Sequence, residues 1–462
     1  MNEQTALRHQ FKITSSQIIP AGFFALILSG ALLLMIPAAT SAGEKTSFLT
    51  ALFTSTTSVC VTGLVVVDTF SHWTILGQII ILVLIQLGGL GIISVTSAVM
   101  LALHKKISLK DRLLIHDAFN LNDMQGLVRF LYKVFKGTFL VEGIGACFYL
   151  IVFVPEFGVA KGIWISVFNS VSAFCNAGID IIGPNSLMNY NSNPLVLIVT
   201  ILLIVLGGLG YVVWFDLCST VKKMFKNHYN PLTFYRRLNE HSKLVINVTL
   251  FLIFSGGLLT LITEYGNVDT IGKLSLGDKI LNSIFQSVTY RTAGFASISQ
   301  KDLHESTAVI GCLYMFIGGS PVGTAGGVKT ITMLVVVLNV VSFIKNRDET
   351  VIFNRKITKD MIQKANAIVT FNFTIIFVLM LLLMTLNHAN AVDSAYEICS
   401  ATSTVGLSRG LTPNLTSVGR IIVITAMYLG RIGPISMALF FNTSSGNGKN
   451  DIKYAEGRFI IG

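Results

Sequence analysis

Four short glycine-containing turns recur along the chain, and their residues are suited to binding a cation through backbone oxygens. The turns are Val61-Thr62-Gly63, Asn176-Ala177-Gly178, Thr292-Ala293-Gly294 and Thr404-Val405-Gly406. Successive glycines lie 115, 116 and 112 residues apart, and a fixed period indicates repeated units. Glycine allows the positive-φ conformations that aim successive carbonyls to one side. Rings of such carbonyls can replace the hydration shell of a monovalent cation.

The side chains near the four glycines differ, which places the expected chemistry in the backbone. The residues three positions before the glycines are Cys60, Cys175, Arg291 and Ser403. A guanidinium that faced a bound cation would repel it, so we expect Arg291 to brace its turn from behind. Only Thr404-Val405-Gly406 matches the core triplet of potassium-channel filters. We therefore expect a less strict filter than four identical turns would form.

The composition indicates a membrane protein. Of the 462 residues, 52% are hydrophobic and 12% are charged, and the mean hydropathy is +0.69. A soluble protein usually carries about 25% charged residues. Apolar runs of about 20 residues, long enough to cross a bilayer as a helix, fill most of the sequence.

The net charge of +11 gathers in three connectors between apolar runs, near residues 105–133, 222–243 and 345–364. Basic loops stay in the cytoplasm. We therefore expect these connectors and both termini on the inner side of the membrane, and this placement argues against nucleic-acid binding. The six cysteines lie in or beside apolar stretches and form no CxxC pair, so we expect neither disulfides nor a cysteine metal site.

Each turn follows a short apolar stretch, and two long apolar stretches flank this pair. The long stretches are residues 18–39 and 75–101, 130–154 and 195–218, 244–262 and 307–344, and 365–386 and 419–441; the short ones are 48–57, 164–172, 280–287 and 395–402. Non-helical backbone in a membrane persists only inside protein or along a water-filled cavity. The order predicts an all-α membrane protein of four tandem helix–pore loop–helix units around one pseudo-fourfold cation pore. It would have eight spans and four re-entrant pore helices.

The predicted units are residues 1–102, 103–222, 223–345 and 346–445, and a cytoplasmic tail follows at 446–462. The short helices would point their negative C-terminal ends at the pore, which favours a cation. A second landmark supports the repeat, because glycine also recurs 25, 29, 24 and 24 residues after the turn glycines. These positions are Gly88, Gly207, Gly318 and Gly430.

A glycine-rich segment interrupts the second long stretch of the third unit, and its glycines and proline disfavour a regular helix. A phosphate-binding loop would need glycine before the lysine, but Val328 precedes Lys329. We expect a flexible loop beneath the filter that gates the pore; a static break that serves packing is the alternative. The predicted gate residues are Gly318, Gly319, Ser320, Pro321, Gly323, Thr324, Ala325, Gly326, Gly327 and Lys329.

Two of the charged residues within predicted spans stand out, because charge in a span is costly and usually faces a cavity or a partner. Arg431 lies beside Gly430, at a depth that matches the glycine-rich loop. It would either repel cations below the filter, as part of the gate, or pair with a carboxylate or with loop carbonyls. We interpret Glu142 as a hydrogen-bonded structural acid, and coupling to protons or sodium is the alternative.

The whole chain resembles the superfamily of potassium transporters that includes the Trk, Ktr and HKT proteins, and most closely the KtrB-type membrane subunits of bacterial Ktr systems. The resemblance rests on residues 289–295, 318–329 and 451–458. It implies potassium uptake, often by sodium-dependent symport, through four linked helix–pore loop–helix units in which the glycine-rich segment is the gate. It also implies a homodimer in the bacterial plasma membrane whose partner is a cytosolic ring of nucleotide-binding, KtrA-type regulatory subunits.

Other function classes are weighed against potassium transport. The first alternative is a less selective sodium/potassium pathway. A secondary transporter of an organic solute also uses broken helices but usually has inverted halves, whereas these units repeat in one direction. A membrane enzyme is disfavoured because no HExxH, GxSxG or paired intramembrane aspartate appears. We expect K⁺ as the transported ion, Na⁺ as a coupling or stimulating ion, and no nucleotide bound by this chain.

Overall fold

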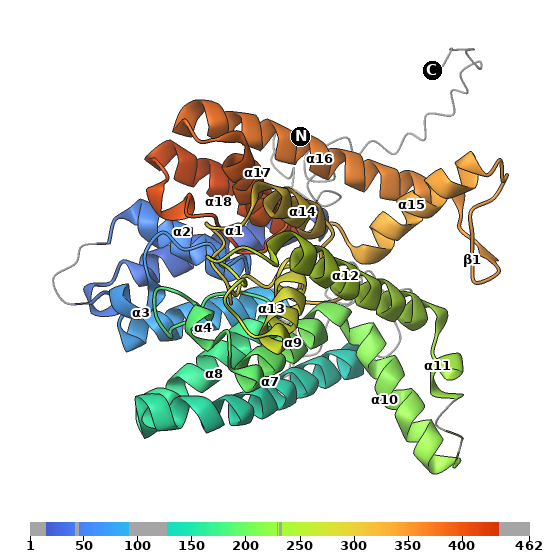
Figure 1. The fold of residues 1–462 in the computed structure, drawn as a ribbon, viewed down its shortest axis with the longest axis horizontal. Helices are drawn as coiled ribbons and strands as arrows, with labels where there is room; N and C mark the ends of the chain where they lie inside the picture. The colour runs from blue at the N-terminus through green and yellow to red at the C-terminus, as the bar shows by residue number, and fades with distance from the viewer. Residues whose placement is uncertain (1–14, 42–45, 92–126, 229, 231–232, 434–462) are drawn as a thin grey trace, which may run out of the picture.

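The computed structural model describes residues 15–41, 46–91, 127–228, 230 and 233–433. Helices make up almost all of its regular structure, and many of them lie lengthwise beside one another (Figure 1). The predicted all-α class is therefore confirmed at the level of a mostly helical protein. The exception is a short hairpin, in which β1 (Val351–Ile352) pairs antiparallel with β2 (Arg355–Lys356).

The helices of the first two predicted units come in the order first helix, pore-loop helix and second helix, although α8 with 17 residues is not shorter than α9 with 16. The first unit contains α1 (Ser15–Leu34), η1 (Pro37–Ala39), α2 (Phe48–Val59), α3 (Thr69–His72) and α4 (Ile75–Leu90). The second contains α7 (Leu127–Phe157), α8 (Val159–Cys175), η2 (Met188–Tyr190), α9 (Pro194–Leu209), α10 (Tyr211–Lys226) and α11 (Phe234–Arg237).

The third and fourth predicted units follow the same order. The third contains α12 (Glu240–Glu264), α13 (Leu276–Thr289), α14 (Glu305–Phe316) and α15 (Thr330–Ile344). The fourth contains α16 (Lys359–Asn387), α17 (Ala391–Thr402), η4 (Thr412–Asn414) and α18 (Ser417–Ile432).

Three helices among the described residues are long and apolar enough to cross a membrane, namely Arg129–Phe157, Glu240–Glu264 and Lys359–Asn387. A fourth span results if α9 and α10, which are bent by 101° at their junction, are counted together. The remaining apolar helices are shorter, because several end where the chain breaks at glycine. The prediction of eight spans therefore stays a prediction.

The second long helix ends early in three of the units, and one sequence prediction is wrong for this reason. Residues 195–218 do not form one helix, because α9 ends before Gly210, whose φ is +88°. In the same way α4 ends before Gly91 and α18 ends before Gly433, with φ of +83° and +82°. A left-handed glycine is the usual stop for a helix. The rest of the predicted runs, 92–101 and 434–441, lies outside the described residues, as do most of the first basic connector and the C-terminal tail.

The four short helices are α2, α8, α13 and α17, and they lie among the longer ones. Side chains of Ser47, Ser275 and Asn390 cap the N-termini of α2, α13 and α17 by accepting backbone N–H bonds. Such caps satisfy N–H groups that would otherwise have no partner. The hydroxyl groups of the short helices are tolerated in the interior because they bond to nearby carbonyls. For example, Oγ of Ser58 donates to the carbonyl oxygen of Thr54 at 2.6 Å.

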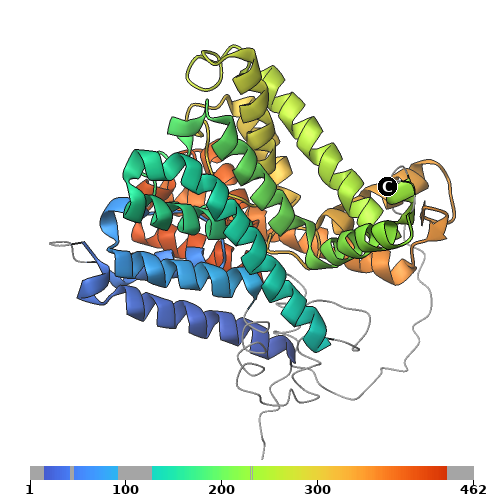
Figure 2. The same cartoon turned by 90° about the horizontal axis from the view of Figure 1, so that it is seen from below.

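The short helices contact long helices in a repeating pattern. Each short helix packs on the first long helix of its own unit, α2 on α1, α8 on α7, α13 on α12 and α17 on α16. Each also contacts the second long helix of the unit before it, since α8 touches α4, α13 touches α9, α17 touches α14 and α2 touches α18. The last contact brings the fourth unit back to the first. Figure 1 shows α16 along the top of the view and α7 along the bottom, with α17, α14 and α13 between them, and Figure 2 shows α1 (dark blue) along the lower edge of the helical body.

Candidate ion-binding site

The four predicted turns share one backbone conformation. Each turn glycine has a positive φ, +99° at Gly63, +63° at Gly178, +85° at Gly294 and +96° at Gly406. The residue two positions earlier also has a positive φ in every turn, between +53° and +66°; this conformation is strained for the three β-branched residues among them and is tolerated by asparagine. These residues are Val61, Asn176, Thr292 and Thr404.

Each turn contacts the next turn along the chain, and the fourth turn contacts the first. A Cβ added at each turn glycine would fall 2.6 Å or less from the carbonyl oxygen of the residue before the glycine in another turn. These pairs are Gly63 with Ala177, Gly178 with Ala293, Gly294 with Val405, and Gly406 with Thr62. Only glycine fits this approach, and four carbonyl groups are brought around a common axis.

The turns are buried but keep unused polar atoms. All twelve residues predicted for the filter lie in these four turns, and all of them are buried except Gly406, which is partly exposed. Among the described residues, the hydroxyl groups of Thr62, Thr292 and Thr404 have no hydrogen-bond partner. A buried polar atom without a hydrogen-bond partner lowers the stability of the fold. A dehydrated cation would give these hydroxyl oxygens and the turn carbonyls a partner.

A cavity of about 460 Å³ lies against one side of the turns, and all four turn glycines line it. Its wall also contains two carboxylates, Asp68 and Asp180, and the ammonium of Lys301. Because the loops that follow the turns form this wall, the cavity gives solvent a route to the ring of carbonyls.

The recurring glycine of the second long helix has a packing role in three units. A Cβ added at Gly88, Gly207 or Gly430 would clash with the last carbonyls of a short helix, at Val59, Phe174 and Thr402 respectively. Each of these carbonyls belongs to the residue four positions before a turn glycine. Gly318 differs, because a Cβ there would clash with the carbonyl of Gly326 within the glycine-rich segment.

The glycine-rich segment spans the gap between α14 and α15 and is bonded to the break between α9 and α10. Ser320 N donates to the carbonyl oxygen of Gly208 at 2.9 Å, and Tyr211 N donates to that of Val322 at 3.0 Å. The hydroxyl of Thr324 donates to the last turn of α8, at the oxygen of Phe174 (3.2 Å). The segment therefore packs directly beneath the second turn.

The same segment also reaches the fourth turn. A Cβ added at Gly326 would clash with the hydroxyl of Thr404, and one at Gly319 would clash with Ala325. Lys329 does not extend away from the segment, because its Nζ donates to the carbonyl oxygen of Ala325 at 2.6 Å. The predicted gate residues thus form one compact loop whose glycines allow close contact with the turns.

Arg431 joins this loop to the first unit. Its Nη1 donates to the carbonyl oxygen of Thr324 at 2.7 Å, and its Nη2 donates to that of Gly88. The bond to Thr324 is one that the pairing interpretation expects, and repulsion of cations below the filter also stays a prediction. The predicted gate residue is therefore in contact with the predicted gate loop.

Arg291 and Glu142, the other two charged residues singled out in the sequence, are both buried. Arg291 is 6% exposed and its Nη2 approaches the hydroxyl of Thr249 on α12 at 3.4 Å, so its guanidinium points away from the axis. Glu142 accepts from Nε2 of Gln86 at 3.1 Å and lies beside the thiol of Cys175, 3.9 Å away. These contacts are those expected of a hydrogen-bonded structural acid.

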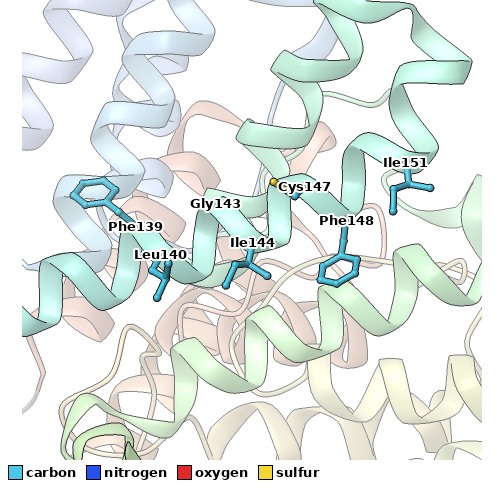
Figure 3. A pocket seen from close by; sticks show the side chains of 7 residues that line it. All are labelled: Phe139, Leu140, Gly143, Ile144, Cys147, Phe148 and Ile151. Atoms are coloured by element: carbon cyan, nitrogen blue, oxygen red, sulfur yellow. The ribbon is translucent and has the colours of Figure 1, made fainter.

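A second cavity, of about 500 Å³, lies on the outer face of α7 and is distant from the turns in the chain (Figure 3). Seven residues of α7 line it: Phe139, Leu140, Gly143, Ile144, Cys147, Phe148 and Ile151. Its wall is almost entirely apolar and faces outward, as a lipid-facing surface would. It offers no group that would hold an ion.

The chain matches the cation transport protein family TrkH over residues 3–450. It belongs to this family. Its relatives include the potassium/sodium uptake protein NtpJ of Enterococcus hirae, 35% identical over 98% of each chain. They also include the Ktr system potassium uptake protein B of Bacillus subtilis, 37% identical over 98% of this chain and 97% of the relative.

The fold is also that of a solved structure. The crystal structure of the potassium transporter TrkH from Vibrio parahaemolyticus covers 94% of this chain, with a TM-score of 0.73 and 15% sequence identity, and the match covers 87% of that chain. The resemblance inferred from the sequence is thus confirmed. The TrkH family consists of transporters, which also confirms that the chain is not an enzyme.

Proposed function

We propose that this chain carries potassium across the membrane through the ring formed by its four glycine turns. The observation that supports the proposal is the closed order of glycine–carbonyl contacts among the turns. Four inward carbonyls offer oxygen ligands in place of the ion's water. The C-terminal ends of α2, α8, α13 and α17 lie next to the turns, and their negative dipole ends favour a cation there.

The glycine-rich loop is the gate in this proposal. It packs beneath the second and fourth turns and would obstruct an ion leaving the ring toward the inner side. Arg431 holds it in place by bonds to two carbonyl oxygens and adds a positive charge below the ring. Opening requires only that this loop shift, because glycines give its backbone several accessible conformations.

The cellular setting follows from the family resemblance. We propose a multi-pass homodimer in the bacterial plasma membrane, with both termini in the cytoplasm. A cytosolic ring of nucleotide-binding, KtrA-type subunits would act on the gate, and sodium would stimulate or couple to uptake. The relative named as part of a Ktr system, at 37% identity, supports such an assembly.

A less selective sodium/potassium pathway is the second candidate, and two observations favour it. One relative at 35% identity is named a potassium/sodium uptake protein. The four turns also differ in sequence, so the ring cannot have the strict symmetry of four identical loops. A solute transporter is disfavoured because the four turns repeat in one direction along the chain, whereas such transporters usually have inverted halves.

Rubidium-86 uptake into proteoliposomes that contain this chain tests the proposal. Unlabelled K⁺ should suppress uptake at concentrations roughly tenfold below those of Na⁺, which corresponds to a modest filter preference. Gly294→Ser should weaken this preference, because the added Cβ would fall 2.6 Å from the oxygen of Val405. Equal competition by K⁺ and Na⁺ would favour the second candidate, and uptake indifferent to both ions would contradict a cation pathway.

A further inference from the structure

Behind each glycine turn, a hydroxyl group of the preceding short helix bonds to the backbone of the turn. In the first turn, Oγ1 of Thr57 accepts the N–H of Gly63 at 2.9 Å. In the fourth, Oγ of Ser400 accepts the N–H of Gly406 at 3.0 Å. Both hydroxyls come from the residue six positions before the turn glycine, and both residues are fully buried.

The second and third turns contain related contacts with different backbone partners. Oγ of Ser172, also six positions before its glycine, accepts the N–H of Ile179 at 3.1 Å. In the third turn the position six before the glycine is Val288, and the hydroxyl comes from the next residue. Thr289 Oγ1 donates to the carbonyl oxygen of Phe295 at 2.7 Å.

These bonds fix the direction of the carbonyl groups. In a trans peptide the N–H and the preceding C=O point in opposite directions. When the N–H of Gly63 points outward to Thr57, the carbonyl of Thr62 must therefore point inward. The same argument turns the carbonyl of Val405 inward in the fourth turn and that of Gly178 inward in the second.

We propose that Thr57, Ser172, Thr289 and Ser400 are positioning residues that hold the turn peptides in the orientation required for ion selection, an inference that rests on the proposed transport of potassium. None of them touches the ion. In three turns the hydroxyl sets an inward carbonyl through its neighbouring N–H. In the third turn, Thr289 instead draws the carbonyl of Phe295 away from the axis, so this turn is held from its far end.

The helix α2 contains a matched control for Thr57. Thr56 is the adjacent residue, has the same side chain and is fully buried. Its Oγ1 donates within the helix to the carbonyl oxygen of Leu52 at 2.7 Å and makes no bond to the turn. Threonine and valine have nearly the same shape, so Thr57→Val and Thr56→Val each remove one buried hydroxyl from α2.

The test is the ratio of the K⁺ and Na⁺ concentrations that halve rubidium-86 uptake, a quantity that does not depend on how much protein is folded. Thr57→Val and Ser400→Ala should each lower the K⁺ preference roughly threefold to tenfold, the range that one lost hydrogen bond corresponds to. Thr57→Ser and Ser400→Thr keep a hydroxyl and should keep the wild-type ratio. Thr56→Val should keep it as well.

The outcomes separate this inference from the proposed function. An unchanged ratio in Thr57→Val and Ser400→Ala, beside a wild type that prefers K⁺, overturns the inference and leaves the pathway intact. An equal fall in Thr56→Val also overturns it, because the effect would then belong to the helix and not to the bond. A wild type without K⁺ preference overturns the selective ring itself. If Thr57→Val yields no folded protein, the K⁺/Na⁺ ratio of Ser400→Ala tests the inference in the fourth turn.

Discussion

At the scale of single residues, the turns show how a site can depend on backbone geometry while its side chains differ. The sequence predicted the four glycines, because their types and spacing repeat. It did not predict the positive φ at Val61 or Thr404, since β-branched residues rarely adopt it. It also missed Thr57 and Ser400, although a hydroxyl six positions before the glycine in three turns was a readable signal.

Asp180 lies in the wall of the cavity that leads to the turns. Burial raises the pKa of its carboxyl to about 6, and the nearby Asp68 carboxylate adds to the rise, while hydrogen bonds from Ser186 and Ile182 oppose it. The carboxylate is therefore charged above pH 6 and becomes neutral as the pH falls below it. Its charge should raise the local concentration of cations at the mouth.

Acidification outside should thus slow transport through loss of this charge. At low K⁺ concentration, we expect initial uptake to fall roughly twofold between pH 7.5 and 5.5, a modest electrostatic effect near the surface. Asp180→Asn should start at the lower rate and remain flat over this range. Asp269→Asn, at an exposed position outside the cavity, is the control and should keep the pH dependence. An Asp180→Asn variant with the wild-type pH profile would contradict this role.

At the scale of elements, the breaks in the second long helices position the gate. Spacing alone predicted the glycines at Gly88, Gly207 and Gly430, and the structure explains the spacing by their contact with the short helices. Spacing did not predict that α9 ends at Leu209, because an apolar run continues beyond it. The helix ends there because Gly210 has a positive φ and contacts the gate loop. Both features depend on the tertiary structure.

Arg431 should keep the gate loop closed by its two carbonyl bonds. Arg431→Gln should raise rubidium uptake by the chain alone about tenfold or more, because charge-assisted hydrogen bonds contribute about 1.5–3 kcal/mol each. Arg431→Lys tests charge against geometry. If the simultaneous bonds of the guanidinium to two carbonyl oxygens hold the loop, Arg431→Lys should also raise uptake, because an ammonium lacks the planar guanidinium geometry.

The matched control for this experiment is Arg420→Gln in the same helix. Arg420 Nη1 donates to the hydroxyl of Thr50 at 3.4 Å, and among the described residues it makes no bond to the gate loop, so uptake should not rise. Folded Arg431→Gln protein with uptake no greater than wild type would show that this arginine does not hold the gate closed.

At the scale of the whole molecule, the order of the helices follows from the repeat. Four copies of one order predicted where the short helices lie to within a few residues at each end. They did not predict the relative lengths, because α8 has 17 residues and α9 has 16. Which helices of neighbouring units touch could not be predicted, because the contacts of α18 with α2 and α8 with α4 join residues far apart in the chain. The β1–β2 hairpin was also missed, as it consists of only two residues per strand.

The central claim is that the four turns form one cation site. Anomalous diffraction from crystals grown with Rb⁺ tests it most directly, because it locates the ion without assuming a mechanism. We predict a peak on the axis of the ring, within bonding distance of the carbonyl oxygens of Thr62, Ala177, Ala293 and Val405. Ordered turns with no rubidium peak between them, or a peak bound elsewhere, would contradict the account.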